Sequence, residues 1–202
     1  MCSSDLRAGD THALAELFDR HHHRLRHMVR LRLDRRLAGR LDASDVLQEA
    51  YLEADKRFAD YLRDPAVPPF LWLRLVTGQA LTDLHRHHFG AKMRDAGMEV
   101  SLHRGALPQA SSVSLAELLL GRLTSPTLAA RRAETQRRLQ EALNRMDPMD
   151  REVLVLRHFE ELSNAETAQV LGLERTVASN RYIRALKRLK AALGGSADLF
   201  EG

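Results

Sequence analysis

Apolar residues recur at intervals of three and four along most of the chain, and no alternating run of useful length interrupts them. This spacing lines one face of a helix, whereas a half-buried strand needs a period of two, so the pattern predicts an all-α fold. In the first half we expect helices over about 11–37, with Asp10 as N-cap and Gly39 as stop, over 44–63, with Asp42 or Ser44 as N-cap, and over 70–88. The second helix should place its apolar side chains on one face: Leu47, Tyr51, Ala54, Phe58 and Leu62. The third is apolar nearly all round in its first turns and should form the centre of its domain.

The helical pattern breaks down between about residues 96 and 126, where Gly, Ser, Pro and Gln surround one short apolar run, SLAELLLGRL. We interpret 96–127 as a flexible interdomain linker that allows a helical turn. The pattern returns at Leu128 and predicts four short helices, one of which should begin with Asp147 as N-cap and Pro148 at the first helical position. The sequence therefore indicates two small helical domains, 1–95 and 128–202.

The second domain contains a helix-turn-helix pattern in SNAETAQVLGLERTVASNRYIRALKRLK. Ser163 and Glu166 have the spacing of a capping box, which predicts the start of a short helix. Gly172 can adopt the left-handed conformation of a tight interhelical turn, and Ala168 is small enough for two helices to cross closely. A longer helix should follow from about Glu174.

This longer helix is basic on one side. At 100° per residue its apolar positions share one face, while polar and basic side chains occupy the opposite face and its flanks: Arg175, Thr176, Asn180, Arg181, Arg184, Lys187 and Arg188. Arg and Asn can pair with guanine and adenine in the DNA major groove, so we interpret this face as DNA-binding. The alternative is a solvated basic face of an amphipathic helix.

Segments from both halves together resemble one protein family. The stretch MDPMDREVLVLRHFEELSNAETAQVLGL with RYIRALKRLK, the segment DVLQEAYLEA over 45–54, and FLWLRLVTGQALTDLHR over 70–86 occur in that family's order. They resemble a bacterial RNA polymerase sigma factor of the sigma-70 type, in the compact extracytoplasmic-function (ECF) group.

The resemblance implies a function for each domain. Domain 1–95 would correspond to sigma domain 2, which binds core polymerase, here through Asp45, Gln48, Glu49 and Leu52. It would also recognise and melt the −10 promoter element, through Gln79, Asp83, Arg86, Lys92 and Arg94. Gln79 stands where the family commonly has Asn, and a longer amide could change which unstacked base is accepted. Arg74 could contact phosphates, whereas Trp72 fits the core better than a base stack.

Domain 128–202 would correspond to sigma domain 4 and read the −35 element with the basic helix. The implied partners are bacterial core RNA polymerase and promoter DNA, and whether an anti-sigma factor also binds stays open. Two other functions compete with this one. A dimeric helix-turn-helix regulator would bind a palindromic operator, and a helical adaptor would bind only protein.

Composition excludes several further classes. No segment of the 202 residues approaches the roughly 18 apolar residues of a membrane span, and the first ten lack an apolar signal region, so we expect a cytoplasmic protein without a membrane partner. Cys2 is the single cysteine, which leaves the ten histidines without thiolate partners, and we expect no metal and no cofactor. We interpret the histidines, His85 among them, as exposed or DNA-facing side chains. Nucleotide-binding and hydrolase motifs are missing from the sequence, so we do not expect an enzyme.

Overall fold

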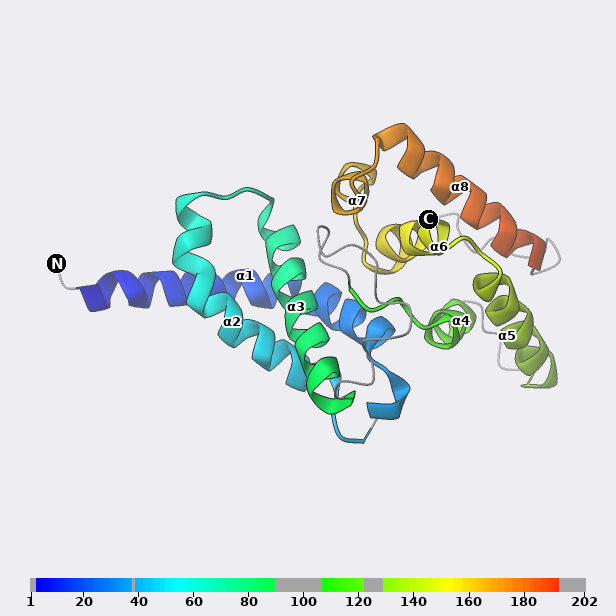
Figure 1. Ribbon diagram of the computed structural model, residues 1–202, viewed down its shortest axis with the longest axis horizontal. Coiled ribbons are helices and arrows are strands. Elements are labelled where there is room, and N and C mark those ends of the chain that lie inside the picture. Colours follow the sequence, from blue (N-terminus) through cyan, green and yellow to red (C-terminus); the bar gives the residue numbers. More distant parts are fainter. Residues whose placement is uncertain (1–2, 38, 90–106, 122–128, 193–202) are drawn as a thin grey trace. The chain divides into compact units, whose positions relative to one another are not determined.

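The computed structural model describes residues 3–37, 39–89, 107–121 and 129–192 (Figure 1). Every regular element in these ranges is helical, so the all-α prediction is confirmed. The chain divides into two compact units, Met1–Pro108 and Gln109–Gly202, which are described separately below. Within the described ranges, no helix combines the length and the hydropathy of a membrane span.

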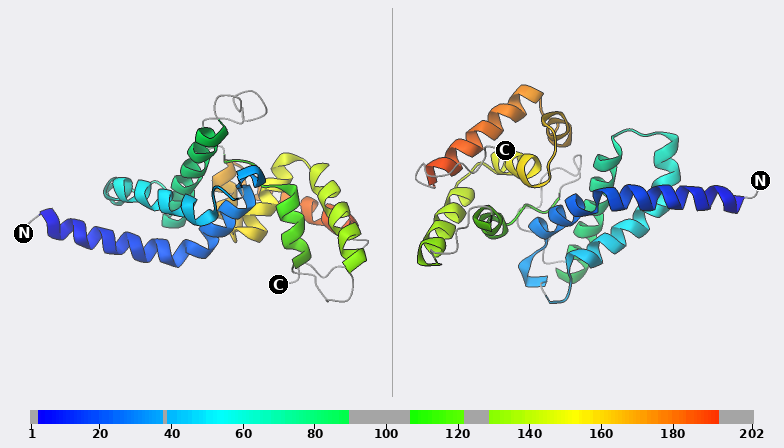
Figure 2. Two further views of the ribbon diagram at one scale, coloured as in Figure 1. Left: turned by 90° about the horizontal axis from the view of Figure 1, so that it is seen from below. Right: turned by 180° about the vertical axis from the view of Figure 1, so that it is seen from behind.

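In the part of the first unit that the structure describes, there are three long helices, α1 (Ser3–Arg32), α2 (Ala43–Arg63) and α3 (Pro69–Phe89). The helices α2 and α3 lie side by side, and both pack against α1 (Figures 1 and 2). Their shared core is almost fully buried and includes Leu25, Val29, Val46, Leu73 and Leu81. Each of the three helices contacts both of the others, so α3 shares the core with α1 and α2.

The boundaries of α1 differ from the prediction at both ends. The helix begins at Ser3, so Asp10 lies inside it and is not its N-cap. Asp in a helix interior costs only a few tenths of a kcal/mol more than most residues, so it need not start a helix. The helix ends at Arg32, before Gly39, because the Asp34 carboxylate accepts the backbone N–H of Arg36 at 2.8 Å and offers the chain a turn instead. The short η1 helix (Arg35–Leu37) follows.

The second helix forms where the sequence predicted it. Asp42 is its N-cap and shares a capping box with Asp45, in which each carboxylate accepts the other residue's backbone N–H. The buried face includes Leu47, Ala54 and Phe58 as expected. Leu62 is an exception, because it is 50% exposed.

The second unit contains more ordered structure than the sequence predicted. Residues 112–121 form a helix, α4 (Ser112–Gly121), which packs on α5 (Ala129–Asn144), so the predicted linker over 96–127 is wrong for this segment. Leu115, Leu119 and Leu120 are buried, and this burial stabilises the helix. The Ser and Pro residues around it had indicated a linker instead. Residues 107–111 are described and contain no helix, whereas 96–106 and 122–127 lie outside the described ranges.

The helix-turn-helix lies after these elements. α6 (Pro148–Leu154) begins at the Asp147 N-cap and continues into the π-helical turn η4 (Val155–Phe159), which is followed by α7 (Asn164–Leu171) and α8 (Arg175–Ala192). α8 packs against α5, α6 and α7 (Figure 2). Leu139, Leu143, Val153, Leu154 and Phe159 form the buried centre of the unit.

Candidate nucleic-acid and protein interfaces

A tight turn sets the direction in which α8 leaves α7. Gly172 has φ 59° and ψ 42°, the left-handed conformation that glycine adopts without a Cβ clash. The N–H of Leu173 donates to the carbonyl of Ala168 at 2.9 Å, and Ala168 is 4% exposed. Asn164 Nδ2 also donates to the carbonyl of Arg175 at 2.8 Å, which ties the start of α7 to the start of α8.

The faces of α8 follow the sequence pattern. Ala178, Ala185 and Leu189 are fully buried. The predicted DNA-facing side chains are exposed, except Arg181, which is half-buried: Arg175, Thr176, Asn180, Arg184, Lys187 and Arg188. Ile183, which the sequence reasoning did not single out, is 47% exposed beside them. Val177 is 40% exposed as well, so the helix presents a polar and basic surface that contains two large apolar side chains.

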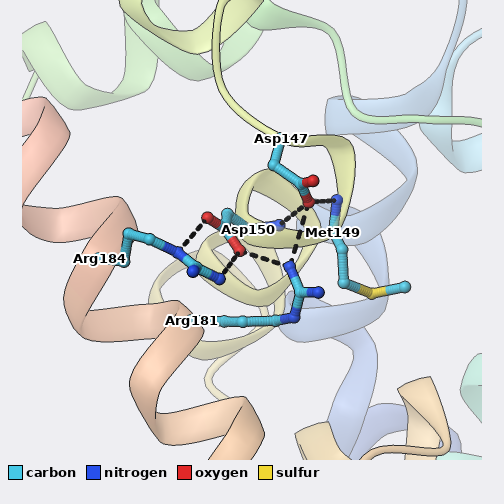
Figure 3. A network of polar contacts seen from close by, with 5 residues as sticks. All are labelled: Asp147, Met149, Asp150, Arg181 and Arg184. Carbon is cyan, nitrogen blue, oxygen red and sulfur yellow. Dashed lines mark hydrogen bonds and ion pairs between the residues drawn. The ribbon is translucent and has the colours of Figure 1, made fainter.

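Two arginines of α8 converge on one carboxylate from α6 (Figure 3). Asp150 accepts from Arg184 through both oxygens, Oδ2 from Nε at 2.7 Å and Oδ1 from Nη2 at 2.9 Å. Asp150 Oδ1 also accepts from Arg181 Nη1 at 2.7 Å, and the same nitrogen lies 3.2 Å from Oδ1 of Asp147. Because Asp147 caps α6 through the N–H groups of Met149 and Asp150, the acidic start of α6 is held rigidly beneath α8.

Burial and neighbouring charges have opposite effects on the pKa of the Asp150 carboxyl group. The Asp150 side chain is 1% exposed, while those of Arg184 and Arg181 are 53% and 26% exposed. Burial raises the pKa of Asp150, but hydrogen bonds and charge from Arg184 and Arg181 lower it more, so the pKa lies below its ordinary value. Asp150 is therefore a buried anion at neutral pH, covered by two cations that face outward.

Asp150 is a residue that sequence reasoning missed. In the sequence it is the third residue of a helix begun by Asp147-Pro148, where an acid is fully explained by the helix dipole. Its partners lie 31 and 34 residues further along the chain. No local signal connects them, and only the packing of α8 on α6 does.

The predicted polymerase-binding residues share the exposed side of α2. Asp45, Gln48, Glu49 and Leu52 are all exposed, and the Leu52 side chain is 50% exposed. Gln48 and Leu52 also border a shallow groove of about 380 Å³ between α1 and α2, which is lined in addition by Phe18, His22, Ser44, Leu47 and Tyr51. This combination of an apolar groove and an acidic, polar rim suits a protein partner with apolar and basic side chains.

The predicted −10 residues lie on α3 as far as they are described. Gln79, Asp83 and Arg86 are exposed, and Asp83 and Arg86 pair at 3.6 Å within the helix. Gln79 Oε1 accepts from Arg57 Nη1 of α2 at 2.7 Å, a neighbour that the sequence did not reveal. Lys92 and Arg94 lie outside the described residues.

Two further expectations for α3 have different outcomes. Arg74 is only 3% exposed, so the expected phosphate contact is wrong: its guanidinium lies within the fold. Trp72 is half-buried, and it stacks on Tyr61 with ring centroids 4.5 Å apart and lies beside Phe58.

The histidines are distributed rather than clustered. The rings of His23 and His27 lie 5.5 Å apart, but the described residues contain no group of three or more His, Cys, Asp or Glu that could hold a metal. His85 is 3% exposed, which corrects the expectation of an exposed or DNA-facing side chain. Its Nε2 accepts the backbone N–H of Asp34 at 3.4 Å, and burial holds its pKa below the ordinary value.

Comparisons with known proteins agree with this geometry. Residues 136–189, which span α5 to α8, match the family model for sigma-70 region 4. Over 189 residues the chain is 30% identical to the ECF RNA polymerase sigma factor SigM of Mycobacterium tuberculosis, covering 93% of this chain and 80% of SigM. It is 25% identical to the RNA polymerase sigma factor NccH of Alcaligenes xylosoxydans xylosoxydans, covering 93% of this chain and 90% of NccH.

A solved structure shares the fold. The structure of CnrH in complex with the cytosolic domain of CnrY superposes with a TM-score of 0.53 at 22% identity and covers 96% of both chains. The similarity therefore extends over both units and is not confined to the helix-turn-helix.

Proposed function

Because the chain belongs to the ECF group of sigma-70 RNA polymerase sigma factors, we propose that the surfaces described above divide the family's tasks between its two units. The chain binds core RNA polymerase and directs transcription initiation at specific promoters. The residue assignments below are our proposal, argued from exposure, charge and hydrogen bonding.

The second unit reads the −35 element with α8. The observation that carries this assignment is the exposed face of α8, on which Asn180, Arg184 and Lys187 point away from the buried Ala178 and Ala185. A helix supported on one side and polar on the other fits the major groove. Arg175 and Arg188 flank this face and suit phosphate contacts, which position the helix without reading sequence.

The first unit holds the polymerase and opens the −10 element. Leu52 provides an exposed apolar anchor, and Asp45, Gln48 and Glu49 surround it with a rim that suits arginine-bearing helices of the polymerase. On α3, Gln79, Asp83 and Arg86 contact the parted strands, joined by Lys92 and Arg94. Extruding a base costs a few kcal/mol, which binding in the assembled holoenzyme offsets.

The decisive experiment is transcription in vitro with bacterial core polymerase and this chain. Its templates are a promoter library randomised at the −35 and −10 positions. We expect transcripts only when the chain is present, with base preferences at both elements. Alanine at Leu52 should weaken polymerase binding without changing these preferences, whereas alanine at exposed Leu62, on the same helix, is the matched control. Transcription that is independent of promoter sequence would contradict the proposal.

The family's members are regulators, and we propose that this chain has no catalytic activity of its own and acts in the cytoplasm with the polymerase. A dimeric operator-binding regulator is not favoured, because the relatives that match 93% of the chain are sigma factors.

We also propose that a protein inhibitor of the anti-sigma class can bind this chain. CnrH, its neighbour in fold, is described in complex with a domain of CnrY. Such an inhibitor would abolish transcription in vitro, and excess chain would restore it.

A further inference from the structure

We propose that Asp150 is a positioning residue for promoter recognition, which holds the guanidinium of Arg184 so that one fixed edge faces the −35 element. This inference rests on the proposed role of α8. It adds a residue that lies on α6, outside the recognition helix, and that does not itself touch DNA.

The first argument concerns which N–H donors of Arg184 are hydrogen-bonded to the Asp150 carboxylate. Asp150 takes the side edge of the Arg184 guanidinium, through Nε and Nη2. Both N–H groups of Nη1 and one of Nη2 remain, and one N–H of each nitrogen forms the end edge of the guanidinium. Figure 3 shows Nη1 without a contact among the residues drawn. The end edge is the geometry that pairs bidentately with guanine O6 and N7 or with a phosphate.

The second argument is exposure. A carboxylate that masked the arginine would cover it, yet Arg184 is 53% exposed while Asp150 is 1% exposed. The anion is therefore buried beneath the helix, and the cation remains at the surface. This arrangement orients the arginine without hiding it from a ligand.

The third argument is the shared contact with Arg181. Oδ1 of Asp150 accepts from both arginines, at 2.7 Å from Arg181 and 2.9 Å from Arg184. The two side chains, one helical turn apart, are thereby fixed relative to each other. Fixing side chains before binding reduces the rotamer entropy that is lost on binding, and this increases affinity for the one sequence that fits the fixed geometry.

Removing the charge should have effects of opposite sign on specific and non-specific binding. In Asp150→Asn the arginines lose a charged acceptor and become mobile, so preference for the favoured −35 base should fall, by about three- to tenfold. At the same time the unit gains net positive charge, so affinity for unrelated DNA at low salt should rise. A residue with a purely structural role would lower both together.

The test uses holoenzyme assembled from core polymerase and each variant, with a template library randomised at −35 and constant at −10. Transcripts are sequenced from one reaction, so the preference ratio does not depend on how much of the variant is folded. The variants are Asp150→Asn, Arg184→Ala, the double variant, and Asp147→Asn. The last variant removes the same charge and keeps an N-cap side chain. Of the two arginines, Asp147 is hydrogen-bonded to Arg181 and not to Arg184, at 3.2 Å.

We expect Asp150→Asn to reduce preference at the same −35 positions as Arg184→Ala, and to have no further effect in the Arg184→Ala background. Asp147→Asn should have a smaller effect. An unchanged preference ratio in Asp150→Asn would overturn the inference, whether transcription from all templates falls, as for a structural role, or rises, as for masking. If the wild-type holoenzyme shows no −35 preference, the proposed role of α8 fails, and the inference fails with it.

Discussion

The two proposed DNA-binding surfaces are built differently. On α8, two arginines are held by a buried carboxylate from another helix, 31 and 34 residues away in sequence. On α3, Asp83 and Arg86 pair within the helix at 3.6 Å, with side chains 73% and 66% exposed, and Gln79 takes one hydrogen bond from an exposed arginine of α2. Exposed pairs of this kind are worth at most about 1 kcal/mol and are weakened by salt.

The difference agrees with the two proposed tasks. Double-stranded DNA is a regular structure, so side chains fixed in advance can match its base edges. Bases of a melted strand are mobile, and adaptable side chains can follow them. We therefore expect substitutions around α8 to change specificity strongly and those around Gln79 to change it weakly, and the following experiments test this contrast.

The largest effect should come from Arg184→Ala. Loss of a bidentate base contact should reduce discrimination at one −35 position about 5- to 150-fold. The measurement is transcription by holoenzyme from promoter pairs that differ at that base. Arg188→Ala is the control, because Arg188 is assigned a phosphate contact, and loss of a phosphate contact should weaken binding to all promoters alike. An equal loss on both members of each pair in Arg184→Ala would reduce Arg184 to a phosphate contact.

A second test compares the stability of the two units. Asp150→Asn should lower the free energy of unfolding of the second unit by about 1–3 kcal/mol, because hydrogen bonds to a charged group are lost. The single tryptophan, Trp72, lies in the first unit, so circular dichroism should report the loss while Trp72 fluorescence does not. A shift of the fluorescence transition would contradict this.

The same variant has a defined pH dependence. The pKa of Asp150 is lower in the folded state than its ordinary 3.8. The ionised carboxylate therefore stabilises the fold fully above that value, and the stabilisation is lost as the pH falls through the folded-state pKa. The difference in the free energy of unfolding between wild type and Asp150→Asn should therefore be constant above about pH 5 and should decrease below it.

The stability of the first unit should also depend on pH, but in a higher pH range, because of His85. Burial lowers the pKa of His85 below its ordinary 6.5, so the folded state disfavours its protonation. The first unit therefore has its full free energy of unfolding at pH values above the ordinary pKa of His85. Part of this stability is lost as the pH falls through the folded-state pKa. Trp72 fluorescence during denaturation should show this loss in wild type and not in His85→Gln, whose amide oxygen can still accept the N–H of Asp34. The same loss in both proteins would exclude His85 as its cause.

Local chemistry explains which features the sequence could predict. The caps at Asp42, Asp147 and Ser163 and the turn at Gly172 each depend on three or four neighbouring residues, and all were confirmed. The helix α4 was missed because its leucines become buried only when α5 packs on them.

In the candidate sites, too, the sequence predicted local features but not contacts between helices. The exposed faces of α2 and α8 follow from helical periodicity, so they could be predicted. The contacts of Asp150 with Arg184 and of Arg57 with Gln79 join different helices. Such contacts require the tertiary packing, and Arg74 and His85 were misjudged as surface residues for the same reason.

A smaller effect concerns the residue just before Gln79. A Cβ at Gly78 would lie 1.9 Å from Cδ2 and 3.0 Å from Cγ of Leu107. Gly78→Ala should therefore destabilise the first unit by about 1 kcal/mol, as overpacking does. In the Leu107→Ala background the clash is absent, and the same substitution should stabilise the helix by about 0.5–1 kcal/mol. Denaturation followed by Trp72 fluorescence measures both values, and the same sign in both backgrounds would refute the contact.

The smallest effect should come from Gln79→Asn. The shorter amide cannot reach Arg57 as Gln79 does at 2.7 Å, so the base that it accepts should change, with a shift in preference of about two- to fivefold at one −10 position. Sequencing of transcripts from a −10 library measures the shift. Arg57→Ala should reproduce part of it if Arg57 orients the amide. A shift as large as that of Arg184→Ala would contradict the contrast between a fixed and an adaptable surface, because it would mean that α3 recognises its base as rigidly as α8 does.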